Sequence, residues 1–251
     1  MRRHCNGHPL NYKRPRHARL DVKRYKASGT LAIDPFDLIA LDTPIFDQAE
    51  QGSCTANALC KVFDFRTKFI KRPAIISSRD YLYRAEEQFD GDINTDSGST
   101  NQSGAQVFKT KGVCLETTWP YSMTDLMNQP PASADAEAAN YKATGTELAQ
   151  DAVTIQQSIL KGNLVAFGIQ LYSGFSDVGA DGVYADPGPN DTYLGGHDMV
   201  IIGWRKVNGI LCWVIDNSWG TDWGMGGRCF INISQTMDPN ICSEFMTLEP
   251  Q

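Results

Sequence analysis

Six short runs rich in β-branched and aromatic residues fill the second half of the chain, and they limit the available folds more than any other feature. Gly, Pro and Asn residues separate the runs, so each run predicts a strand bounded by turns. The runs are residues 164–170, 182–185, 198–204, 211–216, 228–233 and 244–248. We therefore expect the second half to form a mostly antiparallel sheet or barrel.

The first half has helical periodicity instead. After Gly52 and Ser53, apolar residues recur at steps of three and four until Pro73, which predicts an amphipathic helix that begins at Cys54. Further helices are predicted over residues 78–88, 104–111 and 147–161. The two halves together indicate an α+β protein.

Two stretches show no such period. Residues 129–140, which contain Ala, Pro and Asp, are predicted to be a surface connection. Residues 1–40 are interpreted as an appended arm, which leaves one large domain over residues 41–251, mostly helical over about 41–120 and β-rich over about 121–251.

Apolar runs in the chain are short. None approaches the roughly 18 residues needed to cross a bilayer, so no membrane association is expected. The basic start lacks the apolar run of a signal peptide, which at face value predicts a cytoplasmic protein and leaves export by another route open. Oligomeric state cannot be predicted from this sequence.

Charge is distributed unevenly. Residues 1–26 contain nine Lys or Arg and one acid, whereas the remainder contains fourteen Lys or Arg and 28 acids. Opposite charges in the two parts predict either that the arm lies on the body or that it binds an anionic ligand. An arm lying on the body would be placed to cover a cleft.

The histidines narrow the chemistry. His4, His8 and His17 belong to the arm, so the body contains His197 alone. This excludes a body zinc site built from several histidines, and neither the HExxH nor the GxSxG pattern occurs. Neither a metal nor another cofactor is expected, and cysteine is the remaining natural nucleophile.

Cys54 is the candidate nucleophile because it begins a predicted helix. Unsatisfied N–H groups and the positive end of the helix dipole stabilise a thiolate there. A neighbouring imidazolium adds to this effect, and such sites bring a thiol pKa to about 3 to 7.5. The sequence therefore predicts a thiolate–imidazolium pair with His197.

Three segments resemble the papain family of cysteine peptidases. They are residues 47–60 (DQAEQGSCTANALC), 195–204 (GGHDMVIIGW) and 216–231 (DNSWGTDWGMGGRCFI), and they occur in the order and spacing of that family. The third is the most specific, since two tryptophans, four glycines and an asparagine coincide. The resemblance implies a two-lobed papain-like fold, with a helical lobe, an antiparallel β-barrel-like lobe and a cleft between them.

Carried over residue by residue, the resemblance implies cysteine endopeptidase activity on peptide or protein substrates. Cys54 would attack the carbonyl and form a thioester, His197 would transfer protons, and Asn217 would orient His197. Trp219 would shield that contact from water. Gln48 and the backbone N–H of Cys54 would form the oxyanion hole. Each residue alone also has a plain structural interpretation, and only their joint occurrence favours catalysis.

The chain departs from the family pattern at two positions. Gln51 stands where a disulfide-bonded cysteine usually precedes the nucleophile, and Thr55 stands where an aromatic residue follows it. That disulfide therefore cannot form, and Cys60, Cys114, Cys212 and Cys229 are predicted to be buried thiols. Residues 51–58 are more similar to bacterial members than to plant or lysosomal ones.

The sequence contains few indications of which substrate side chains are preferred. By resemblance, Gly98 and Ser99 would approach the S3 and S2 wall, Gly196 would flank the S2 pocket, and Ser243 or Glu244 would lie near the base of that pocket. Trp219 would also contribute to substrate binding, and each of these residues equally has a plain surface interpretation. Family members are commonly zymogens, although the arm is too short for their long helical proregion. Two alternatives remain at this point: a non-catalytic peptide-binding protein on a papain scaffold, and an acyl-transferase with the same nucleophile.

Overall fold

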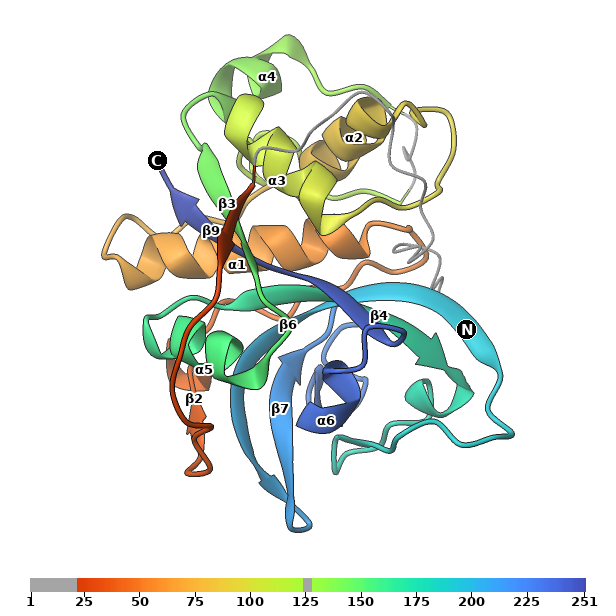
Figure 1. Cartoon of the computed structure of the whole chain (residues 1–251). Helices are drawn as coiled ribbons and strands as arrows, with labels where there is room; N and C mark the ends of the chain where they lie inside the picture. The colour runs from red at the N-terminus through yellow and green to blue at the C-terminus, as the bar shows by residue number, and fades with distance from the viewer. Residues whose placement is uncertain (1–21, 124–127) are drawn as a thin grey trace.

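Helix α1 (Cys54–Phe69) crosses the middle of the molecule, between a group of helices and a sheet (Figure 1). The computed structural model describes residues 22–123 and 128–251. All residues of α1 are buried except Arg66, Lys68 and Phe69 near its end. The helix predicted to begin at Cys54 is therefore confirmed, and its burial on both sides fixes the position of its first residue.

The helical side contains α2 (Arg79–Asp90), α3 (Asn101–Thr110) and α4 (Ala132–Ala138) (Figure 1). Their ends follow ordinary capping rules, since the Ser78 hydroxyl accepts from the Tyr81 N–H and Gly91 ends α2 with a φ of 86°. The helices predicted over 78–88 and 104–111 are confirmed with shifted bounds.

The surface connection predicted over residues 129–140 is wrong, because α4 forms there. Ala134 and Ala138, one turn apart, are both buried, and the Tyr81 hydroxyl on α2 donates to Asp135 over 2.8 Å. A helix this short has almost no periodicity to detect, and its burial depends on α2 as a packing partner.

The sheet contains nine strands within the described residues. Its order is β1-β3-β9-β4-β6-β7-β8-β5, with β2 paired to β6 off this path. The strands are β1 (Lys23–Tyr25), β2 (Phe36–Asp37), β3 (Ala143–Leu148), β4 (Val165–Tyr172), β5 (Val183–Tyr184), β6 (Tyr193–Val207), β7 (Ile210–Asp216), β8 (Arg228–Asn232) and β9 (Cys242–Pro250). All six predicted strands are present, and every pair is antiparallel except β1–β3 and β5–β8.

Short helices cover and connect the strands. They are α5 (Ala152–Leu160), α6 (Ile233–Thr236), η1 (Ile39–Leu41) and η2 (Ser173–Phe175). The single helix predicted over residues 147–161 is partly wrong, because Glu147 pairs with Met246 in the sheet. The chain enters α5 only after Asp151, whose carboxylate accepts from the Thr154 N–H and caps the helix.

The interpretation of residues 1–40 as an appended arm is wrong for residues 22–40, which are built into the body. β1 pairs in parallel with β3, and β2 pairs with β6. The Trp204 indole donates to the Asp34 carbonyl over 2.8 Å, and the Gln156 amide bonds both backbone groups of Ala32. The predictions made for residues 1–21 lie outside the described residues.

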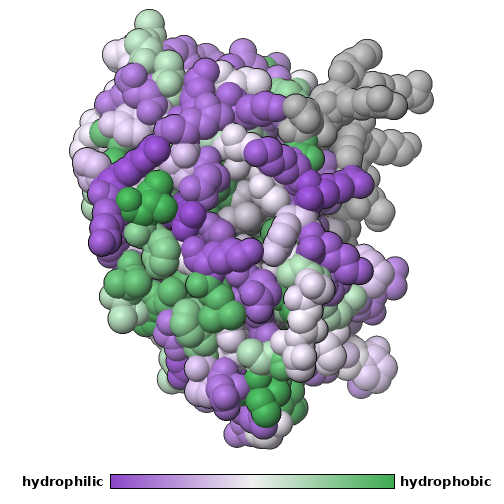
Figure 2. All heavy atoms as spheres, turned by 60° about the vertical axis from the view of Figure 1, so that its left-hand side comes forward, coloured by the Kyte–Doolittle hydropathy of each residue, from purple (hydrophilic) through white to green (hydrophobic). Residues whose placement is uncertain are grey.

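Apolar side chains gather on one face of the molecule. Figure 2 shows them over the lower part of the face on which β1, β2 and α5 lie. Exposed apolar residues in these segments and beside them include Leu31, Ile33, Leu41 and Leu160. Within the described residues, no helix is both long and apolar enough to span a bilayer.

Candidate active site

Cys54 is the first residue of α1 and is fully buried. Burial dominates the pKa of its thiol, and the backbone N–H groups of Asp198 and Thr55 lie close enough to the sulfur to oppose that effect. Asp198 immediately follows His197 on β6, so its contact brings that strand to the tip of α1. The structure thus places the predicted nucleophile beside the strand that carries the predicted base.

His197 is held by Asn217, which follows the last residue of β7. Its Nε2 lies 2.7 Å from Asn217 Oδ1. The same Oδ1 accepts the backbone N–H of Ser218 over 2.8 Å, so this atom is an oxygen and Nε2 must carry the hydrogen. In a neutral ring the lone pair then lies on Nδ1, which has no hydrogen-bond partner in the part of the chain that the structure describes.

Aromatic rings surround this pair. The ring centroid of Trp219 lies 5.2 Å from that of His197 and 5.1 Å from that of Phe175. Trp223 extends the group, with its centroid 4.8 Å from that of Phe175. These contacts keep water from the His197–Asn217 hydrogen bond, where it would compete.

Gln48 lies in the segment before α1 and is fully buried. Its backbone N–H donates to the Ser218 carbonyl over 2.8 Å, and its Oε1 accepts a short hydrogen bond from the Ser218 hydroxyl. One Nε2 hydrogen donates to the Gln51 carbonyl over 2.8 Å, which leaves the second hydrogen for another acceptor. Ser218, the residue next to Asn217, thus holds both the backbone and the side chain of Gln48.

Comparison with known proteins settles the family. A family model described as papain family cysteine protease matches residues 36–247. This chain belongs to that family. The predicted papain-like fold and the predicted enzyme class, a cysteine protease and hence a hydrolase, are confirmed.

Individual papain-family relatives are distant. Xylellain, a cysteine protease from Xylella fastidiosa, is 27% identical, has a TM-score of 0.85, and the match covers 99% of this chain and 98% of xylellain. An uncharacterized peptidase C1-like protein of Acanthamoeba polyphaga mimivirus is 27% identical over 81% of this chain and 68% of its own length. Cysteine proteinase 2 of Entamoeba histolytica is 26% identical over 80% of this chain, and the match spans only 62% of that relative.

The protonation state differs from the expectation for Cys54. Burial, and then the nearby carboxyls of Asp198 and Glu86, raise the pKa of the Cys54 thiol well above its ordinary value. Burial also lowers the pKa of His197 to about 4, against a smaller opposing effect of the Asn217 hydrogen bond. The prediction of a lowered thiol pKa is therefore wrong for this buried arrangement, because loss of water outweighs the helix end.

The structure places the predicted substrate-binding residues on the helical side and on β6. Gly98 (φ 80°) donates its N–H to the Tyr83 hydroxyl over 3.1 Å, and the Ser99 hydroxyl donates to Asp90. Gly196 precedes His197 in β6 and pairs with Gln170. Ser99 is fully buried, and Gly98 and Gly196 are buried as well.

A buried polar group beneath Cys54 escaped the sequence analysis. The Asn101 amide donates to Asp198 over 2.7 Å and to the Glu244 carbonyl over 3.2 Å, which joins α3, β6 and β9. Burial raises the pKa of Asp198 well above its ordinary value, as does the proximity of Glu244 and Glu86. The one sign of this group in the sequence is the acid, Asp198, that directly follows His197.

Behind the site lies a buried ion network. Lys61 on α1 contacts Asp42 over 3.0 Å and Asp216 over 2.6 Å, and Arg228 contacts the same two carboxylates over 2.7 Å and 2.8 Å. Burial raises the pKa of Asp216 to about 7. Because Asp216 directly precedes Asn217 and Lys61 lies on α1, the network fixes the end of β7 against α1.

All six cysteines within the described residues are buried and free: Cys54, Cys60, Cys114, Cys212, Cys229 and Cys242. The prediction of buried thiols is thereby confirmed for the four residues it named. No group of His, Cys, Asp or Glu in the described part of the chain has the arrangement of a metal site. The histidines of residues 1–21 lie outside that part.

Proposed function

We propose that this protease cleaves peptide bonds with Cys54 as nucleophile, His197 as general base and acid, and Asn217 as the residue that orients His197. The observation that carries the proposal is the bare Nδ1 of His197. Asn217 holds the hydrogen on Nε2, and Asp198, the next residue, bonds the Cys54 sulfur. Nucleophilic catalysis by a thiol requires a base whose lone pair can reach it, and the unprotonated Nδ1 of a residue whose neighbour Asp198 lies at Cys54 supports that role.

The first step starts from neutral partners. As substrate enters, Nδ1 takes the proton of the Cys54 thiol and the sulfur attacks the scissile carbonyl carbon. Nδ1 then returns that proton to the departing amine, and the C–N bond breaks to leave a thioester. Water, deprotonated by Nδ1, attacks the thioester and releases the acid and the thiol.

Gln48 and the Cys54 N–H are proposed to stabilise the oxyanion. As the first residue of α1, Cys54 has a backbone N–H without a partner inside the helix. Gln48 retains one Nε2 hydrogen, and its fixed amide needs no reorganisation when charge develops.

Peptide hydrolysis by wild type, Cys54→Ala and Cys60→Ala tests this proposal. Cys60 is a matched control, because it is a fully buried thiol on the same helix. We expect Cys54→Ala to abolish hydrolysis and Cys60→Ala to retain it. Full hydrolysis by Cys54→Ala would contradict the assignment.

Two alternatives differ from peptide hydrolysis in what becomes of the peptide. A non-catalytic peptide-binding protein would bind peptides without cutting them. An acyl-transferase would pass the acyl group to an added amine in place of water, and product analysis with a competing amine separates it from hydrolysis. Proton transfer between Cys54 and His197 serves either enzyme, and the family assignment favours hydrolysis.

The basic arm is proposed to regulate the enzyme. Its charge, opposite to that of the body, supports either a cover over the cleft or a site for an anionic ligand. Deletion of residues 1–21 tests both: faster cleavage of a small peptide supports the cover, and loss of salt-sensitive nucleic-acid binding supports the ligand. Equal rates and equal binding would contradict both.

A further inference from the structure

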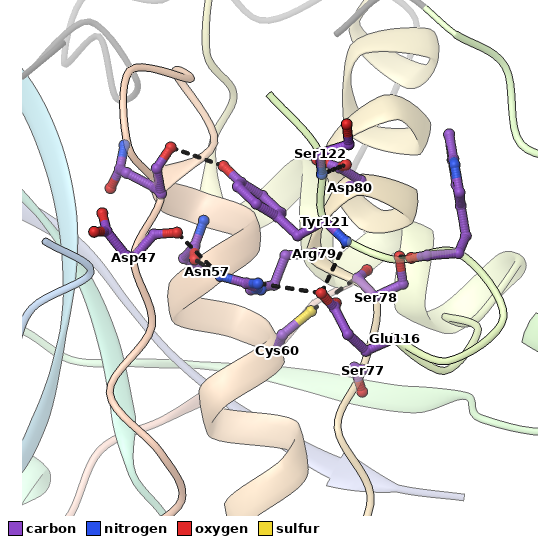
Figure 3. Close-up of polar contacts among 12 residues, drawn as sticks. Asp47, Asn57, Cys60, Ser77, Ser78, Arg79, Asp80, Glu116, Tyr121 and Ser122 are labelled. Carbon is purple, nitrogen blue, oxygen red and sulfur yellow. Dashed lines mark hydrogen bonds and ion pairs between the residues drawn. The ribbon is translucent and has the colours of Figure 1, made fainter. Parts of the chain in front are cut away.

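We infer that Arg79 and Tyr121 are positioning residues of the oxyanion hole. They act through a line of four hydrogen bonds that begins at the Arg79 guanidinium and ends at the backbone carbonyl of Gln48. The inference rests on the proposed function, since it assumes that Gln48 stabilises the oxyanion. Figure 3 shows Arg79 lying between Asn57, Tyr121 and Glu116.

The direction of each bond follows from its two ends. Arg79 can only donate, and its Nη1 lies 3.2 Å from Asn57 Oδ1. The Asn57 amide therefore donates to the Ser53 hydroxyl over 3.1 Å. At the other end, the Gln48 carbonyl can only accept, and it takes the Tyr121 hydroxyl hydrogen over 2.9 Å.

The direction of the bond between Ser53 and Tyr121 is then fixed. Tyr121 uses its only hydrogen on Gln48, so the Ser53 hydroxyl must donate to Tyr121 Oη over 2.7 Å. All four bonds run from the cation toward the Gln48 carbonyl. Hydrogen bonds aligned in one direction in a buried site strengthen one another.

Arg79 is itself fixed on several sides. Its guanidinium carbon lies 4.1 Å from the ring centroid of Tyr121 and 4.5 Å from that of Phe46. It forms an ion pair with Glu116 over 3.2 Å and donates to the Asp47 carbonyl over 3.3 Å. Glu116 also accepts the Tyr121 N–H over 2.8 Å, so the cation and the tyrosine are positioned together.

The segment that they hold needs external support. Ala49 has a φ of 50°, a left-handed conformation that disfavours residues with a Cβ. Gln51 provides no thiol, so no disulfide anchors the turn. Tyr121 bonds both its start, at Gln48, and its end, at Ser53, which directly precedes Cys54. Both proposed oxyanion donors therefore depend on one hydroxyl.

Tyr121→Phe tests the inference because it removes the hydroxyl and keeps the ring under Arg79. We expect kcat on a peptide substrate to fall about tenfold with KM nearly unchanged, a fraction of the loss that follows removal of an oxyanion donor. Inhibition by a peptide aldehyde, whose adduct with Cys54 places an oxygen in the hole, should weaken about as much. Alkylation of Cys54 by iodoacetamide forms no oxyanion and should change less than about twofold.

Ser53→Ala is a second variant that removes the middle of the line. The Ser53 side chain makes no capping bond to α1, so helix capping is not lost. Tyr81→Phe is the control. Tyr81 lies on α2, as Arg79 does, and this substitution deletes a part-buried hydroxyl bond to Asp135 on α4 that does not involve Gln48. It should lower the melting temperature and leave kcat unchanged.

A double-mutant cycle completes the test. In a Gln48→Ala background, Tyr121→Phe should have a clearly smaller effect on kcat than in wild type, because one of the two donors that it positions is already absent and only the Cys54 N–H remains. Wild-type kcat in both Tyr121→Phe and Ser53→Ala would overturn the inference, as would an equal loss in the Gln48→Ala background or a parallel fall in alkylation. Hydrolysis that survives in Cys54→Ala would instead overturn the proposed function.

Discussion

His197 and Asn217 share a hydrogen bond of 2.7 Å whose direction is set by a third group, the backbone N–H of Ser218. Because Ser218 donates to Asn217 Oδ1, the ring must donate from Nε2 and keep its lone pair on Nδ1. The backbone of Ser218 therefore determines which ring nitrogen of His197 keeps its lone pair and can accept a proton.

Asn217→Ala should lower kcat by one to two powers of ten, since the ring loses its fixed tautomer but remains able to accept a proton. General acid–base catalysis contributes about 10²- to 10⁴-fold, so part of it should survive. Asn217→Asp keeps an acceptor for Nε2 and should lose less. Steady-state kinetics with both variants checks the order, and an equal loss in the two would contradict an orienting role.

Gln48→Ala should lower kcat by about 10²- to 10³-fold, the usual cost of one oxyanion donor. Gln51→Ala is the comparison, because it removes a neighbouring amide side chain while the carbonyl that accepts from Gln48 remains. The fall in kcat should be much smaller for Gln51→Ala than for Gln48→Ala. A Gln51→Ala loss as large as that of Gln48→Ala would mean that the loop as a whole, and not the Gln48 amide, matters.

His197 should stay neutral down to about pH 4 in the folded, ligand-free protein, because burial lowers its pKa. NMR titration of the imidazole signals, assigned with a His197→Gln variant, measures this directly. A titration midpoint near 6.5 would indicate a solvated ring.

The same shift makes stability depend on pH. The unfolded chain binds a proton to this histidine below about pH 6.5, whereas the folded chain does so only below about pH 4. The unfolded state is therefore favoured increasingly as pH falls from 6.5 to 4. Urea unfolding at both pH values should show a smaller loss in His197→Gln than in wild type, and an equal loss would contradict the buried neutral ring.

Lys61→Met should destabilise the fold by about 3 to 5 kcal/mol, because it removes the more deeply buried of the two cations that Asp42 and Asp216 share. Lys68→Met is the control on the same helix, since Lys68 is exposed and its ammonium donates to the Asp42 carbonyl without an ion pair among the described residues. Urea unfolding compares the two. A loss below about 1 kcal/mol for Lys61→Met would show that Arg228 alone compensates both acids.

Local sequence pattern accounts for part of this structure. The start of α1 at Cys54 and the six strands follow from periodicity and turn residues, which act over short distances. The roles proposed for His197 and Asn217 came from three spaced motifs. By contrast, α5 begins later than its pattern indicates because Asp151 caps it, and residues 22–40 are ordered by the sheet despite having no period of their own.

Other features depend on residues far apart in the chain. Arg228 and Asp42 meet across 186 positions, and Tyr121 reaches Gln48 across 73. No local pattern marks such pairs, because each partner alone resembles an ordinary surface residue. The raised pKa of Cys54 likewise depends on how completely the folded site excludes water.

The most direct test of the account is to identify the thiol that reacts with an electrophilic peptidyl inhibitor. Purified protein would be incubated with the inhibitor, digested and mapped by mass spectrometry, with His197→Ala treated in parallel. We predict modification of Cys54 alone in wild type and much slower modification in His197→Ala. Modification of another cysteine, or equal rates in the two proteins, would contradict the claim that Cys54 and His197 act together.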